Sequence, residues 1–106
     1  MAKSNAEEVL DHLQRMFPRA NAKERQAIAE LARHSRGLRH AHAPNAAWLA
    51  ALSYIRHYYT DYDALLAEGY DRDAARYFVL EAINLRLEAW GCRQRLLPSE
   101  PLPPSP

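Results

Sequence analysis

A series of helix-capping signatures constrains the fold more than any other feature of the sequence. In such a signature a short polar side chain accepts a hydrogen bond from a backbone N–H at the start of a helix, and an acidic residue often follows three positions later. Four positions begin a signature of this kind: Ser4, Asn21, Thr60 and Asp71. The sequence therefore predicts several short helices separated by tight turns.

Apolar side chains recur every three or four residues between these signatures, which is the period of a helix that packs on one side. Gly37, Gly69 and Gly91 fall where a left-handed residue would end a helix. We predict five helices, near residues 5–17, 22–35, 45–59, 61–68 and 72–90. Strand signals, such as alternating β-branched runs and Asn-Gly turns, are missing between them. The predicted fold class is all-α, a compact bundle of helices.

The large apolar side chains on the predicted helix faces define the expected core. They are Leu13, Phe17, Ile28, Leu31, Trp48, Leu52, Ile55, Leu66, Phe78, Val79, Ile83 and Leu87. On the third helix we take the stripe of large residues that begins at Trp48 to be the inward face.

With 106 residues, the chain has the length of one domain. After Leu97 it contains five prolines in nine residues, a composition typical of disordered or polyproline-like segments. We therefore predict a single helical domain over residues 1–97 and a disordered Pro-rich tail over residues 98–106.

The single cysteine, Cys92, excludes an intramolecular disulfide and gives no sign of an oxidising compartment. No apolar run approaches the roughly 18 residues that a membrane-spanning helix needs, and the first residues lack the apolar segment of a signal peptide. We expect a cytoplasmic protein that has no membrane partner.

Charge is distributed unevenly, although the formal net charge is only +1. Residues 15–42 hold seven basic and two acidic residues, a net of +5, and residues 60–90 hold seven acidic residues and three arginines, a net of −4. Such an asymmetry is compatible with a protein that has one half facing nucleic acid. It also fits two halves that attract each other, within one fold or between two copies of the chain.

The basic part of the chain contains the candidate contacts to nucleic acid. Six of its seven basic residues are arginines, whose planar guanidinium groups suit phosphate oxygens and base edges. The candidate nucleic-acid-binding residues are Arg33, Arg36, Arg39, His40 and Arg56. We predict that they present a basic surface to a phosphate backbone.

Polar residues are densest where the third predicted helix meets the last two. We predict a hydrogen-bonded polar junction whose members are Arg56, His57, Thr60, Asp61, Asp63, Arg72 and Arg76. Within it, His57 and the carboxylates of Asp61 and Asp63 have the chemistry to bind a divalent metal or to transfer protons. Helix capping and buried pairing account for the same residues without a ligand. We favour that interpretation and assign no metal site.

The same region resembles a known family. The pattern R-H-x-x-T-D-Y-D-x-L-L begins at Arg56, the pattern G-Y-D-R-D-x-A-R begins at Gly69, and the last helix ends in W-G at Trp90 and Gly91. These motifs, within residues 16–91, are similar to a family of small bacterial proteins known as a domain of unknown function, serial two-two-nine-three. The resemblance implies no activity, cofactor or partner, because none is assigned to that family.

Three function classes follow from these observations. A nucleic-acid-binding module that uses the basic segment is the first hypothesis, and a non-enzymatic protein-interaction module, such as a homodimer, is the second. A metal-dependent enzyme around His57, Asp61 and Asp63 is the third. It is the least favoured because the sequence has no hydrolase, kinase, nucleotide-binding or H-E-x-x-H signature. We expect no cofactor.

Overall fold

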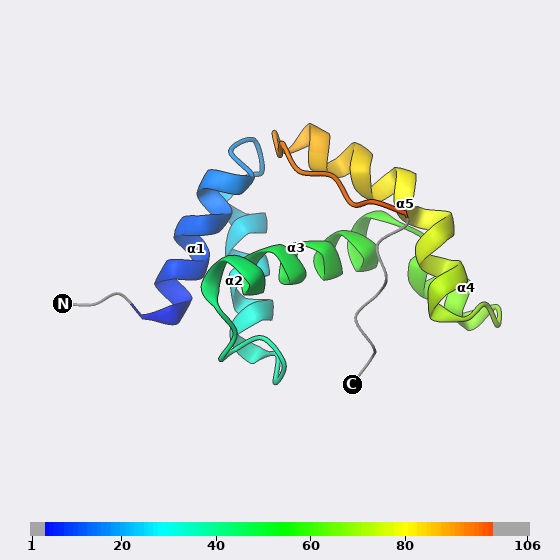
Figure 1. Ribbon diagram of the computed structural model, residues 1–106, viewed down its shortest axis with the longest axis horizontal. Helices are drawn as coiled ribbons and strands as arrows, with labels where there is room; N and C mark the ends of the chain where they lie inside the picture. Colours follow the sequence, from blue (N-terminus) through cyan, green and yellow to red (C-terminus); the bar gives the residue numbers. More distant parts are fainter. Residues whose placement is uncertain (1–3, 99–106) are drawn as a thin grey trace.

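The computed structural model describes residues 4–98, and within this range it confirms the all-α fold (Figure 1). Its helices are α1 (Asn5–Met16), α2 (Ala22–His34), α3 (Ala43–Tyr59), α4 (Tyr62–Ala67) and α5 (Arg72–Ala89). Each begins and ends within two residues of the predicted position, and no residue between 4 and 98 lies in a strand. The predicted disordered tail lies, from residue 99 onward, outside the described residues.

Side-chain caps start three of these helices as the sequence predicts. Ser4, Asn21 and Asp71 each accept a hydrogen bond from the backbone N–H three residues later, at 3.2, 2.8 and 2.8 Å. Each bond satisfies an N–H group that has no partner inside the helix. The cap chemistry therefore fixes where α1, α2 and α5 begin.

Two other helix ends depart from the predicted chemistry. Asp61 rather than Thr60 is the residue before α4, and its side chain makes no capping bond. The Thr60 hydroxyl instead accepts a hydrogen bond from the N–H of Tyr62, at 3.1 Å. Gly37 does not adopt a left-handed conformation, since α2 already ends at His34, with Ser35 as its C-cap.

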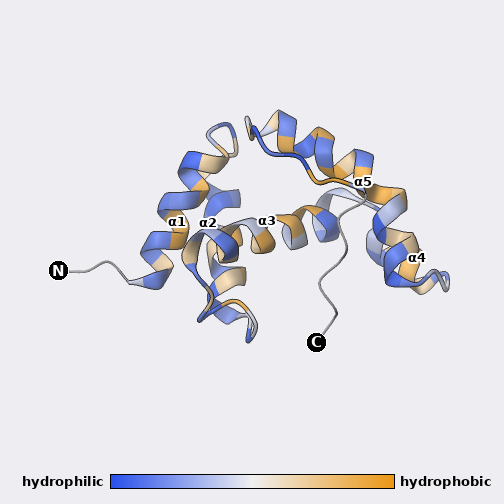
Figure 2. Cartoon of the chain, in the orientation of Figure 1, coloured by the Kyte–Doolittle hydropathy of each residue, from blue (hydrophilic) through white to orange (hydrophobic). Residues whose placement is uncertain are grey.

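The central helix, α3, contacts every other helix of the described range (Figure 1). One of its faces consists of small buried side chains: Ala43, Ala46, Ala47, Ala50 and Ala51. These alanines occupy the half of α3 on which α1 and α2 pack. Small side chains allow helix backbones to approach closely, toward the short end of the usual interaxial range. The large apolar residues of α3 therefore point elsewhere, and Figure 2 shows hydrophobic residues along the middle of this helix.

The core differs from the predicted one at several positions. Phe78 is 59% exposed and packs against Tyr70, with ring centroids 5.4 Å apart. Leu31, Trp48 and Leu66 are half-buried. The other predicted members are buried: Leu13, Phe17, Ile28, Leu52, Ile55, Val79, Ile83 and Leu87. Among the described helices α5 packs against α3 and α4. Its outer side is uncovered, and Phe78 points there, because adjacent helical residues diverge by about 100°.

The turn between α1 and α2 is joined to the end of α5, which closes the chain on itself (Figure 1). The Arg19 N–H donates to the Trp90 carbonyl at 2.9 Å, and the Phe17 and Trp90 rings meet edge to face with centroids 5.6 Å apart. Gly91 has a φ of +79°, and a Cβ there would lie 3.1 Å from the Pro18 side chain. Both the left-handed backbone and the close approach require glycine at this position.

Tyr59 ties α3 to α2 and α5 beside this closure. Its hydroxyl donates to the Glu24 Oε1 at 2.6 Å. Its ring lies 3.8 Å below the Arg86 guanidinium carbon and meets Trp90 edge to face. The hydrogen bond to the Glu24 carboxylate, together with burial, raises the pKa of Tyr59 to about 12. The folded state thus favours the neutral phenol.

Because the pKa of Tyr59 is raised, its contribution to the stability of the protein decreases at high pH. An unfolded tyrosine titrates near pH 10, so the contribution of Tyr59 is fully present below pH 10 and is lost as the pH rises through about 12. We expect the melting temperature of Tyr59→Phe to fall less steeply between pH 9.5 and about 11.5 than that of the wild type. Thermal melts followed by circular dichroism measure this slope. Tyr77→Phe, at an exposed tyrosine, should keep the wild-type slope. Equal slopes in all three proteins would contradict the raised pKa.

Two substitutions on α5 test which side of the helix is buried. Ile83→Ala removes a fully buried side chain and should lower the free energy of unfolding by about 2–5 kcal/mol. Phe78→Ala, on the exposed side, should lower it by less than about 1 kcal/mol. Urea denaturation measures both values. A larger loss for Phe78→Ala than for Ile83→Ala would show that the orientation of α5 is wrong.

Candidate binding groove

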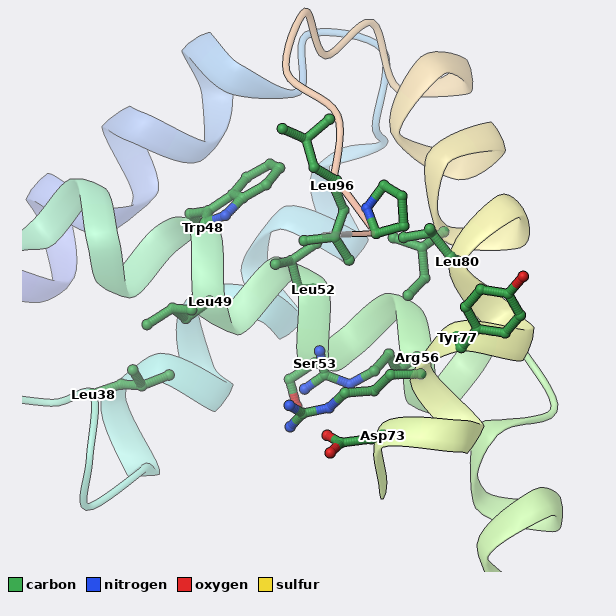
Figure 3. A pocket seen from close by; sticks show the side chains of 14 residues that line it. Leu38, Trp48, Leu49, Leu52, Ser53, Arg56, Asp73, Tyr77, Leu80 and Leu96 are labelled. Carbon is green, nitrogen blue, oxygen red and sulfur yellow. The ribbon is translucent and has the colours of Figure 1, made fainter. Parts of the chain in front are cut away.

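A groove with a volume of about 740 Å³ lies between α3 and α5 (Figure 3). Leu38, from the loop before α3, and the segment 96–98 after α5 complete its walls. The residues that α3 contributes are Trp48, Leu49, Leu52, Ser53 and Arg56, and those from α5 are Asp73, Arg76, Tyr77, Leu80 and Ile83. Most of the lining is apolar, and Figure 3 shows the charged side chains gathered at one end.

The sequence of α3 produces this wall because its apolar residues occupy two sides of the helix. Positions 48, 49, 52, 53 and 56 follow one another by one, three, one and three residues, a spacing that places them on one face. The buried alanines at positions 43, 46, 47, 50 and 51 repeat the same spacing on the opposite face. One face of α3 therefore packs in the core while the other lines the groove.

The segment after α5 is held at the groove by a pair of hydrogen bonds. The Asn84 side chain donates to the Leu96 carbonyl at 3.0 Å and accepts from the Leu96 N–H at 2.8 Å. This clamp fixes the backbone at Leu96, so that Leu96, Leu97 and Pro98 reach the groove wall. The apolar end of the groove therefore depends on one asparagine of α5.

Two arginines without carboxylate partners lie at the charged end of the groove. Within residues 4–98, neither Arg56 nor Arg76 has a carboxylate oxygen within 4.0 Å of its side-chain nitrogens, although Asp73 lines the same end. The Nε of Arg76 is buried and has no hydrogen-bond partner. The guanidinium carbon of Arg56 lies 5.5 Å from the centroid of the Tyr62 ring. Buried donors of this kind are usually satisfied, and leaving one unsatisfied costs stability.

The surroundings of Arg56 disfavour its positive charge. Burial, and secondly the positive charge of Arg76, lower the pKa of Arg56. Arginine nevertheless stays protonated at neutral pH, because the guanidinium group is not deprotonated in proteins. A bound anion would offset the repulsion between the two guanidinium groups and accept hydrogen bonds from them. The arrangement is therefore suited to hold one negatively charged group.

The predicted polar junction divides into two groups in the structure. His57 Nδ1 contacts Asp63 Oδ2, which joins α3 to α4, and both side chains are more than half exposed. The Thr60 hydroxyl donates to the carbonyl of Arg56, while the guanidinium groups of Arg56 and Arg76 lie in the groove. Asp61 and Arg72 are exposed. His57 therefore has a carboxylate partner, but the two side chains meet at the surface and not in the interior.

Neither a metal site nor a membrane span is found in the described part of the chain. Residues 4–98 contain no group of three or more His, Cys, Asp or Glu side chains arranged to hold a metal ion. His57, Asp61 and Asp63 therefore do not form the three-ligand set that the third hypothesis needs. In the same range, no helix combines the length and the apolar character that crossing a membrane requires.

The predicted basic surface is smaller than the charge count suggests. Arg33 is paired with Glu30 at 2.8 Å, and the same carboxylate also contacts His34. Arg36, Arg39 and His40 are exposed, and their side chains have no partner among the described residues. Arg56 lines the groove and does not lie with these residues on the loop. Leu38 is the residue of the loop that reaches the groove.

Sequence reasoning missed the groove itself, although one signal pointed to it. The segment 43–59 is apolar almost all the way around, and a helix of that kind needs partners on every side. From the sequence we assign only the large residues of this segment to the core. The alanines are then given no role, and the two different faces of the helix are therefore not recognised. No nearby sequence feature predicts that Arg56 and Arg76 lie close together, because their proximity depends on how α3 and α5 cross.

Arg76→Met should raise the stability of the protein. Methionine keeps the aliphatic length of the side chain but removes the charge that opposes Arg56 and the buried, unsatisfied Nε. We expect a gain of about 1 kcal/mol in the free energy of unfolding, measured by urea denaturation. Arg72→Met, at an exposed arginine on the same helix, is the control and should change it little. A clear loss of stability in Arg76→Met would show that Arg76 has a stabilising partner.

The chain matches a protein-family model over most of its length. The family described as "Uncharacterized conserved protein (DUF2293)" matches residues 12–91, a range that includes α2 to α5 and both groove arginines. Comparison with curated proteins and with solved structures gave no significant match. The match confirms the resemblance carried by the motifs around Arg56 and Gly69. The chain belongs to the uncharacterised conserved protein family DUF2293.

Proposed function

We propose that this protein is a nucleic-acid-binding module whose contact surface is the basic loop between α2 and α3. We define the basic loop by its exposed cationic residues, Arg36, Arg39 and His40. The observation that carries the proposal is that these side chains have no carboxylate partner among residues 4–98. Unpaired exposed arginines are available to phosphate oxygens without breaking an existing ion pair.

Neighbouring residues extend this surface. Arg33 and Arg39 line the same small pocket, so the end of α2 and the loop lie side by side. Arg33 keeps its charge available in part, because its bond to Glu30 is exposed and such pairs contribute little. The Asn5 side chain donates to the Arg39 carbonyl at 3.1 Å, which holds the loop against α1. Because the loop is held in this way, it loses little conformational entropy when its arginines bind a partner. The proposal places the protein in the bacterial cytoplasm, where nucleic acid is available.

A protein-interaction module is the second candidate, and an aromatic cluster on α5 favours it. Tyr77 and Phe78 are 70% and 59% exposed, and the Phe78 ring contacts both Tyr70 and Tyr77. Exposed clusters of large apolar side chains mark surfaces that a partner covers. A second copy of the chain is the simplest such partner, and it would bury the uncovered side of α5.

Fluorescence anisotropy with labelled single- and double-stranded DNA and RNA tests the first proposal. Two or three phosphate contacts predict that the logarithm of the duplex-DNA affinity falls with the logarithm of salt with a slope of roughly −2 to −3. The double substitution Arg36→Glu and Arg39→Glu should abolish binding to all sequences alike. Lys23→Glu with Arg72→Glu makes the same change in net charge at two exposed positions elsewhere and should retain most of the binding.

Light scattering on the same samples separates the two candidates. Flat anisotropy at low salt, with a dimer that Phe78→Ser dissociates, would exclude the nucleic-acid proposal in favour of the interaction module. Equal losses in the two double variants would show that binding follows net charge and not the basic loop.

A further inference from the structure

We propose that the groove between α3 and α5 binds a small amphipathic anion, an unbranched apolar chain that carries one carboxylate, with Arg56 and Arg76 holding the carboxylate. This inference does not depend on the proposed nucleic-acid function, because it concerns a different surface. The basic loop residues are exposed and charged, whereas the groove is lined mainly by apolar side chains from α3, α5 and the segment 96–98.

The size and lining of the groove favour a small ligand. Its volume, about 740 Å³, falls within the roughly 300–1,000 Å³ typical of pockets for small molecules. Leucines from α3, α5 and the segment 96–98 form most of the apolar wall, with Trp48 among them (Figure 3). Such walls suit an alkyl chain better than the polar edges and charged backbone of a nucleotide.

The arginine pair supplies the observation that points to a ligand. Arg56 is partly desolvated and faces a second positive charge, and the Nε of Arg76 is buried without an acceptor. Both features are unfavourable, and a carboxylate bound by the outer nitrogens of the two guanidinium groups would offset the first, the repulsion between their charges. Two guanidinium groups can share one carboxylate through charge-assisted hydrogen bonds, which are among the stronger polar contacts in proteins.

The local charge selects a singly charged head group. Arg56 and Arg76 contribute +2 and Asp73, at the same end, contributes −1, which leaves a net of +1. A monoanionic carboxylate neutralises this charge, whereas a phosphate dianion would exceed it and would be repelled by Asp73. Arg56 and Asp73 lie at one end of the aliphatic wall (Figure 3), which matches a molecule with its charge at one end.

Isothermal titration calorimetry of the full chain with dodecanoate tests the proposal, at concentrations below those at which the fatty acid self-associates. Dodecanol and dodecyltrimethylammonium, which carry a similar chain with a neutral or a positive head, are the comparison ligands. We expect saturable binding of dodecanoate at one site, at least tenfold weaker binding of dodecanol, and no binding of the cation. Binding of dodecanol as tight as that of dodecanoate would overturn the proposal.

Arginine variants assign the head-group contact. Arg56→Met and Arg76→Met should each weaken dodecanoate binding about tenfold or more and leave dodecanol binding unchanged. Arg72→Met, at an exposed arginine outside the groove lining, should bind dodecanoate as the wild type does. Unchanged affinity in both groove variants would overturn the proposal.

Trp48 provides a second measurement on the unmodified protein. A dodecanoate with a bromine on its chain should quench the part of the tryptophan fluorescence that Trp48 in the groove wall contributes, and unlabelled dodecanoate should reverse the quenching. No quenching at saturating ligand would overturn the proposal. A concentration-dependent dimer that Arg76→Glu dissociates, without dodecanoate binding, would assign the groove to a second copy of the chain instead.

Discussion

The packing of the alanine face of α3 against α1 and α2 is the contact on which the rest of the structure depends. Because Ala46, Ala47 and Ala50 are small, three helices meet around them without a large side chain from α3 between their backbones. The large residues of α3, such as Trp48 and Leu52, must then face the other way. The α5 helix and the segment after it pack on this second face of α3 and cover it incompletely. The groove is thus a consequence of how closely the first three helices pack.

The same arrangement explains why the groove has a charged end. Arg56 follows Leu52 by one turn on α3, and Arg76 precedes Leu80 by one turn on α5, so each arginine ends an aliphatic row. Long arginine stems can pack along apolar walls, but here the two heads approach each other with no acid paired to either in the described residues. Natural sequences depart from favourable local placement mainly where function requires it. The exposed pair of His57 with Asp63 shows no such departure.

Most of the fold was predictable because its signals are local. The cap residues Ser4, Asn21 and Asp71 act within one turn of their helices, and the structure keeps each of them. Which face of a helix is buried is not a local property: Phe78 has the size of a core residue, but nothing in the described chain covers its side of α5. The candidate site was less accessible to sequence reasoning for the same reason. Arg56 and His57 are adjacent in sequence, but about 100° of helical rotation sends one into the groove and the other to the surface.

The closure between the α1–α2 turn and the end of α5 also limits how the groove can move. At its start α5 is connected to α4 through the turn at Gly69, where the Tyr70 N–H bonds to the Leu65 carbonyl at 3.1 Å, and at its end Trp90 is bonded to Arg19. A helix supported at both ends cannot swing outward like a hinged lid. The segment at Leu96 has a weaker support, two hydrogen bonds to Asn84. The segment 96–98 is therefore the part of the groove wall whose position depends on the fewest hydrogen bonds, and its place there is set separately from the helical core.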